Sequence, residues 1–350
     1  MQSDTSSTEV LSGEAVKTST DLLLRMLAGG VVAVCLLFLV NNFLIFLWGW
    51  PGSIALFSHL HWFGLEPLVS PLTGGELGLG WFQLLSYLGS LGAVVAYVLM
   101  TRDRALREDA RRLAAMAAYI VRAAFWVVLL VGLADMVISF LRVEGFLESL
   151  AGEALTAELG RPRFRGPYVH MPLLLLSLVI AGFVRMPGYH WLALLVVFSE
   201  FQIVISRFVF SYEQAFMGDL VRFWYAALFL FAAAPALLDE GHVRVDVLYT
   251  NFSKRGKAWS NAAGSVLFGL PLCWVILTTG MWGKGSSINS PLLSFEISQS
   301  GYGLYVKYLM AGFLVVFAVS MLVQFAGYFL NSVADLRSEP GDEVAGETQV

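Results

Sequence analysis

Two acidic residues lie inside long apolar stretches of the sequence, where a carboxylate is difficult to accommodate. Asp135 and Glu200 each have predominantly apolar residues on both sides. An ionisable group inside a membrane span is costly, so it marks a functional site by default. Each acid could pair with a neighbouring helix or a partner subunit, handle protons or ions, or lie at the membrane interface instead. Arg207 follows Glu200 by about two helical turns and shares its face, with Val204 between them.

Other residue patterns that carry chemistry are missing from the sequence. A haem-binding membrane bundle needs axial histidines inside its spans, but the histidines fall in predicted loops or at span ends: His59, His61, His170, His190 and His242. Serine nucleophile elbows, phosphate-binding loops and HExxH patterns do not occur. The two cysteines, Cys35 and Cys273, sit in apolar runs and are expected to be packing residues. We therefore expect no catalytic residue, cofactor or metal site, which argues against an enzyme and against a membrane-embedded redox subunit.

The composition is that of a membrane protein. Of the 350 residues, 57% are hydrophobic and 14% are charged, and the mean hydropathy is +0.71. A soluble fold of this size would leave too much apolar surface exposed. The net charge of -4 shows no basic excess, which excludes nucleic acid as a partner.

Eight segments have the length and composition of transmembrane helices, each of which needs about 20 apolar residues. The stretch 168–209 is too long for one span, and Pro187-Gly188 divides it into two. The predicted spans are 22–48, 77–100, 117–141, 168–183, 189–209, 220–238, 261–282 and 304–330. The polar ends, 1–20 and 336–350, are predicted to be disordered. The sequence thus predicts an all-α integral membrane protein.

Basic residues set the predicted orientation, because short loops rich in Lys and Arg stay on the cytoplasmic side. They collect after the second and sixth spans, whereas the loop 49–76 has none. Both termini are therefore expected to be cytoplasmic. The exception is a group of three arginines in a predicted periplasmic loop, namely Arg161, Arg163 and Arg165.

Two loop segments are amphipathic when they are read as helices. Segment 104–116 has an apolar stripe opposite several arginines, which is typical of a cytoplasmic helix that lies on anionic lipid. Segment 146–159 sets leucines against glutamates. It is either a solvated surface helix or an acidic ledge on which a partner docks.

The two halves of the chain share a weak internal repeat. A constant shift lays Arg107 and Asp109 on Arg244 and Asp246, and Gly132 on Gly269. Spans two to four then match spans six to eight, which predicts two parallel four-helix units, 21–186 and 187–335, because each unit has an even number of spans. Chance similarity between unrelated four-helix hairpins is the alternative.

The second unit carries a recognisable motif between its second and third spans. Residues 240–248 read EGHVRVDVL, which closely resembles the signature of the small membrane subunit of tripartite ATP-independent periplasmic (TRAP) transporters. Asp219 and Arg222 match an acid-x-x-Arg element of that family, with Asp in place of Glu. The other matching positions are Arg207, His242, Arg244, Asp246, Glu296, Ser298, Gly303, Tyr305, Lys307 and Gln324. The first unit keeps only Arg107 and Asp109, so the chain looks like an enlarged form.

The resemblance implies a function in a three-part transporter of the bacterial inner membrane. A periplasmic solute-binding protein delivers an organic acid or similar solute, a large permease subunit moves it with sodium, and the small subunit braces the permease among the membrane lipids. Arg244 and Asp246 would serve either as a topology anchor or as a specific contact to the permease. The alternative is a free-standing secondary transporter built from two parallel repeats, with Asp135 and Glu200 as coupling residues. The sequence leaves the solute open.

Overall fold

Helices that could cross a membrane make up most of the protein. The computed structural model describes residues 19–185, 190–238, 249–298 and 303–339, and the elements assigned within these ranges are all helical. Eight helices in the described residues are long and apolar enough to span a bilayer: Ser19–Trp48, Gly74–Met100, Leu106–Val143, Pro162–Phe183, His190–Phe210, Ala215–Leu238, Lys254–Met281 and Lys307–Leu336. The predicted all-α fold and its eight spans are confirmed.

Five of these spans are single helices and three are divided. The single helices are α1 (Ser19–Trp48), α3 (Gly74–Met100), α4 (Leu106–Val143), α9 (His190–Phe210) and α15 (Lys307–Leu336). The divided spans are α7 (Pro162–Arg165), η2 (Gly166–His170) and α8 (Met171–Phe183); α10 (Ala215–Phe231) and α11 (Ala233–Leu238); and α12 (Lys254–Gly264), η4 (Ser265–Gly269) and α13 (Leu270–Met281). Short helices in the connections are α2 (Gly52–His59), η1 (Trp62–Gly64), α5 (Phe146–Ala151), α6 (Glu153–Leu159), η3 (Tyr249–Asn251) and α14 (Asn289–Ser294).

Prolines explain why three spans are divided. A proline has no backbone N–H to donate to the carbonyl four residues earlier, so it disturbs the preceding turn. In the fourth and seventh spans a turn of π-helix, η2 or η4, ends two residues before Pro172 or Pro271. In the sixth span the helix is interrupted at Ala232, just before Pro235.

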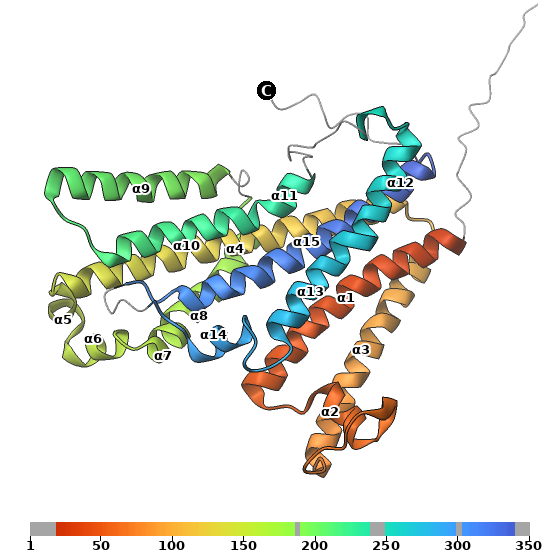
Figure 1. The fold of residues 1–350 in the computed structure, drawn as a ribbon, viewed down its shortest axis with the longest axis horizontal. Helices are drawn as coiled ribbons and strands as arrows, with labels where there is room; N and C mark the ends of the chain where they lie inside the picture. Colours follow the sequence, from red (N-terminus) through yellow and green to blue (C-terminus); the bar gives the residue numbers. More distant parts are fainter. Residues whose placement is uncertain (1–18, 186–189, 239–248, 299–302, 340–350) are drawn as a thin grey trace, which may run out of the picture.

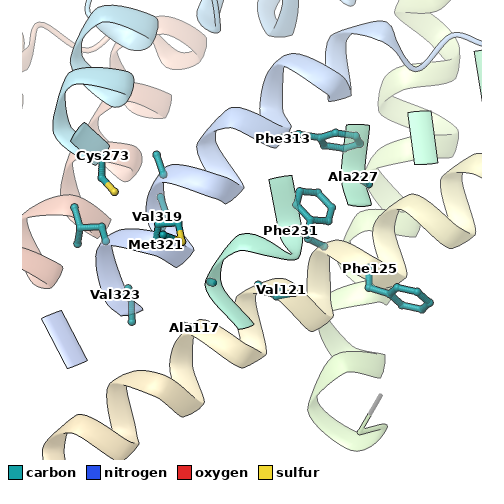
Figure 2. Packing of buried hydrophobic residues seen from close by; sticks show 14 of the residues in the cluster. Ala117, Val121, Phe125, Ala227, Phe231, Cys273, Phe313, Val319, Met321 and Val323 are labelled. Carbon is teal, nitrogen blue, oxygen red and sulfur yellow. The ribbon is translucent and has the colours of Figure 1, made fainter. Parts of the chain in front are cut away.

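The centre of the bundle is the pair α4 and α15. These two helices pack along each other, and α1, α10, α12 and α13 pack around them (Figure 1). Buried side chains from α4, α10, α13 and α15 form one cluster, part of which is drawn in Figure 2. In this cluster the ring of Phe313 lies 4.9 Å from that of Phe231 and 5.1 Å from that of Phe223. Since α4 belongs to the first half of the chain and α15 to the second, both halves share this core.

Two glycines allow aromatic side chains to approach the backbone closely. A Cβ atom at Gly132 of α4 would lie 2.8 Å from the indole nitrogen of Trp224, which donates a hydrogen bond of 2.9 Å to the Val128 carbonyl. A Cβ atom at Gly269 of η4 would lie 2.7 Å from the ring of Phe325. Lipid gives apolar helices no hydrophobic reason to associate, so such close contacts carry much of the packing energy.

The helices α3 and α9 lie at opposite edges of the bundle (Figure 1). Helix α9 packs on α10, and α3 packs on α1 and α2. Large apolar side chains on both helices are exposed, including Phe82 on α3 and Phe201 on α9. Both edges therefore face lipid or a partner.

The amphipathic pattern of segment 104–116 predicts a separate helix on the membrane surface, but the structure does not contain such a helix. The segment forms the first turns of α4, because neither Pro nor Gly interrupts the chain between Leu106 and Val131. Leu106 is buried, so the start of the segment packs inside the bundle. The second segment, 146–159, is helical but divided into α5 and α6 at Gly152, whose φ of +81° breaks the helix.

Both polar tails are shorter than the predicted ranges 1–20 and 336–350. Ser19 and Thr20 belong to α1, and Leu336 is the last residue of α15. Arg337 pairs with Asp21 at 3.3 Å, which joins the outer ends of these two helices. The remaining tail residues, 1–18 and 340–350, lie outside the described residues. The division into units 21–186 and 187–335 stays a prediction.

Candidate functional site

Asp135 lies at the centre of a buried polar cluster near one end of the bundle. Its side chain is fully buried on α4, and Oδ1 accepts hydrogen bonds from Arg165 Nη1 at 2.8 Å and from His170 Nε2 at 3.1 Å. Oδ2 accepts a hydrogen bond from the backbone N–H of Tyr305 at 2.5 Å. The carboxylate is therefore closed by a buried cation and two further donors, rather than open to an ion or a substrate.

Arg165 is held from several sides. Its Nε donates to the carbonyl of Leu159 at 2.9 Å, and its guanidinium lies 4.0 Å from the ring centre of Tyr305. The Tyr305 hydroxyl donates to the Gly160 carbonyl at 2.9 Å and accepts from Arg142 Nη1 at 2.6 Å. These hydrogen bonds offset part of the cost of burying the ion pair, while Arg165 Nη2 has no hydrogen-bond partner among the described residues.

His170 extends the cluster to the start of the last span. It belongs to the π-turn η2, and its Nδ1 lies 2.9 Å from the hydroxyl of Tyr308 on α15. The same π-turn begins at Gly166, where a Cβ atom would lie 2.3 Å from the ring of Phe295. Glycine is therefore required for the chain before α15 to pack against this turn. The cluster thus joins the first half of the chain to the second.

A second ionic cluster ties the opposite end of the bundle together. Arg25 of α1 donates from Nε to Asp109 at 2.6 Å and from Nη1 to the Thr101 carbonyl at 2.8 Å. Arg107 of α4 donates to Asn331 at 2.9 Å and to Asp335 at 2.6 Å, both on α15. Asp109 therefore joins two helices of the first half, and Arg107 joins α4 to α15 of the second half; the predicted repeat aligns these two residues with Arg244 and Asp246.

The predicted residues of the second half gather partly around one hollow at the end of the bundle that carries Asp135. Asp219 lies 3.3 Å from Arg222 and accepts hydrogen bonds from Ser298 and from the Leu304 backbone, each at 3.1 Å. Asp219, Arg222 and Ser298 line an open depression of about 430 Å³, and the same three residues border a second one of about 320 Å³ together with Leu304 and Lys307. Lys307 pairs with Glu296 at 2.5 Å. This arrangement fixes the loop before α15 to the start of α10.

Helix α9 presents its charged residues outward. Glu200, Val204 and Arg207 are all exposed, as their shared face requires. Arg207 lies 3.3 Å from Glu213 beyond the end of α9. Within the described residues Glu200 has neither a hydrogen bond nor an ion pair, so the two intramembrane acids differ: Asp135 is enclosed and Glu200 is presented to the surroundings.

The turn after α9 is fastened to the end of α4. The Tyr212 hydroxyl donates to the Glu144 carboxylate at 2.7 Å. Partial burial and this hydrogen bond raise the pKa of Tyr212 to about 12. The phenol is therefore protonated, and able to donate, at physiological pH.

Three of the sequence-predicted residues cannot be placed. His242, Arg244 and Asp246 of the HVRVD segment lie outside the described residues. The sequence does not reveal the partners of Asp135: Arg165 falls in a predicted loop, and His170 falls at the end of the predicted span 168–183. A signal for them existed, because Arg165 belongs to the one arginine group that contradicts the predicted charge distribution.

The comparisons with known proteins agree with the motif. Residues 194–334 match the family described as tripartite ATP-independent periplasmic transporters, DctQ component. No curated protein and no solved structure matches the chain. The matched region covers α9 to nearly the end of α15, and thus all four spans of the second half. The protein is therefore a multi-pass membrane protein whose second half, over residues 194–334, matches the DctQ component family of TRAP transporters.

Proposed function

We propose that this chain braces the large permease subunit of a TRAP transporter in a bacterial inner membrane. The permease would take up an organic acid or similar solute together with sodium, after a periplasmic binding protein delivers it. The observation that carries the proposal is the DctQ match, which names a transporter component rather than an enzyme. Both termini would be cytoplasmic, as the arginines between α3 and α4 favour.

The enclosed state of Asp135 supports a bracing role over a transporting one. A coupling acid must bind and release an ion or a proton, which requires access. Asp135 is instead locked by Arg165, His170 and the backbone of Tyr305. We therefore assign Asp135 a structural role, and the free-standing transporter is the less favoured reading.

The permease would dock on the edge formed by α9. Glu200 is the eleventh of 21 residues in this helix, so it lies about 15 Å from either helix end at 1.5 Å per residue. A charged carboxylate at that depth costs about 2.5–3.5 kcal/mol if it faces lipid. A hydrogen-bond donor or cation of the permease would remove this cost. Exposed apolar side chains such as Phe198 and Phe201 would supply the contact area.

Affinity purification from membranes that contain the whole transporter tests this proposal. In mild detergent the tagged chain should retain the large permease. Phe201→Ala and Glu200→Ala should reduce the amount retained, whereas Phe82→Ala on α3 should not. Phe82 is a matched control, because both phenylalanines are 60% exposed and lie at opposite edges.

Two outcomes would contradict the proposal. If the wild-type chain purifies without a permease under conditions that keep other membrane complexes intact, the bracing role is wrong. If Phe82→Ala releases the permease and Phe201→Ala does not, the docking edge is α3 rather than α9. The role of Arg207, Asp219, Arg222, His242, Arg244, Asp246 and Glu296 in this contact is part of the same proposal and can be tested in the same way.

A further inference from the structure

We propose that a groove in the first half of the chain binds a phospholipid with an anionic headgroup. The groove runs between α1, α3 and α4 at the end of the bundle where Ser19 lies, and it holds about 370 Å³. Nearly all of its lining residues precede the DctQ match, which begins at residue 194; Leu330 of α15 is the one lining residue within the matched region.

The groove is polar at one end and apolar along the rest. Its polar lining residues are Arg25, Tyr97, Asp109 and Arg112, and they form its mouth, close to where α3 ends and α4 begins. From there it follows α1 past Gly29 to Leu36, and Ala93 of α3 forms the facing wall. Seven residues of helix correspond to about 10 Å. A charged mouth followed by an apolar channel of this length fits a phosphate headgroup with the first part of an acyl chain.

Two arginines are held side by side at the mouth. The Tyr97 hydroxyl accepts hydrogen bonds from Arg104 and, at 3.1 Å, from Arg112. Two guanidinium groups that share one phenol oxygen repel each other, and an anion placed between them relieves the repulsion. The pair thus has donors in position for phosphate oxygens, which arginine binds well.

The charge around the mouth favours an anionic lipid. Arg25 is not available, because Asp109 neutralises it. Glu108 is shared between Arg111 and Arg112, at 2.9 and 3.0 Å. Among the described residues, Arg104 shares the Asp109 carboxylate with Arg25, so the three arginines Arg25, Arg104 and Arg112 pair with the two acids Asp109 and Glu108. Basic pockets between membrane helices are typical binding places for anionic headgroups.

A free inorganic anion fits less well than a lipid. Apart from its mouth the groove is lined by small and aliphatic side chains, including Val32 and Ala33, which have no hydrogen-bond donor or positive charge for an anion. Gly29 also brings α1 and α3 close together, since a Cβ atom there would lie 2.9 Å from Val94. The channel is therefore shaped by the packing of these two helices.

Binding of phosphatidylglycerol to the purified full-length chain tests the proposal. Native mass spectrometry should show more phosphatidylglycerol than phosphatidylcholine retained at equal concentrations. Arg112→Gln should weaken phosphatidylglycerol binding by about fivefold or more, the factor expected for one basic residue at an anionic surface. Arg111→Gln is the matched control, because both side chains pair with Glu108 and are similarly exposed, at 57% and 52%, but only Arg112 lines the groove.

A second pair of variants tests the apolar channel without changing any charge. Ala93→Trp should fill the groove and displace the lipid, whereas Ala96→Trp, outside the groove on the same helix, should leave binding unchanged. Thermal unfolding of each variant shows whether it is folded. The proposal is overturned if Arg111→Gln and Arg112→Gln act equally, if both lipids bind alike, or if inorganic phosphate competes while Ala93→Trp has no effect.

Discussion

Replacement of Asp135 by alanine should destabilise the protein more than any other single removal of a charge among the described residues. The substitution leaves Arg165 fully buried without its counter-ion, and it also removes the acceptor of the His170 and Tyr305 hydrogen bonds. Loss of one partner from a buried ion pair costs about 3–5 kcal/mol. Asp135→Asn keeps an acceptor for Arg165 and Tyr305, so it should lie between the wild type and Asp135→Ala.

The two buried cysteines provide the measurement. Cys35 and Cys273 are unpaired and buried, so a thiol-reactive dye in detergent should react with them only when the protein unfolds. Unfolding carries an entropy of about 2.1 cal/mol/K per residue, so in a chain of 350 residues 1 kcal/mol shifts the midpoint by about 1.4 °C. Asp135→Ala should therefore lower the midpoint by about 4–7 °C.

A double variant separates lost charge pairing from other damage. Asp135→Leu combined with Arg165→Met removes both charges and fills a similar volume, and such replacements are often neutral or stabilising. It should therefore be more stable than Asp135→Ala alone. If Asp135→Ala unfolds at the wild-type temperature, or if the double variant is the less stable of the two, the buried ion pair does not stabilise the fold as described.

Three further predictions concern packing, the second ionic cluster and topology. Gly269→Ala should cost about 1–3 kcal/mol, because the added methyl group meets the Phe325 ring; Gly89→Ala, with nothing within 4 Å of the added atom, should be neutral or slightly stabilising in the same thermal assay. Arg107→Ala should cost about 1 kcal/mol through its partly exposed contacts with Asp335 and Asn331, and Arg111→Ala, in an exposed pair on one helix, should cost less. Alkaline phosphatase fused after Val350 should be inactive in cells and a fluorescent protein fused there should fluoresce; active phosphatase would reverse the proposed orientation.

The spans could be predicted from the sequence because bilayer thickness fixes the length of an apolar helix. The ends of the helices could not be predicted in this way, because hydropathy shows where a helix leaves the lipid and not where the helix itself ends. Helix α4 continues to Leu106 through arginine-rich turns that no Pro or Gly interrupts. In contrast, Gly152 divides the helical stretch before the fourth span, and that signal was visible in the sequence.

The candidate site was only half predictable for a related reason. The position of Asp135 in an apolar stretch showed that the residue needs a partner. Its partners come from three separate elements, at Arg165, His170 and Tyr305. Their convergence depends on how α7, η2 and the start of α15 pack against α4, which no local pattern encodes. Glu200 was found from the sequence by the same reasoning, but only the structure shows that Glu200 is exposed whereas Asp135 is enclosed.

Reconstitution of transport in liposomes tests the bracing role most directly. The solute would be the one that the periplasmic protein of the same transporter binds, offered with an inward sodium gradient. We expect no uptake into vesicles that hold only this chain, and uptake into vesicles that also hold the large permease and receive the loaded periplasmic protein. Uptake by the chain alone would contradict the proposed function.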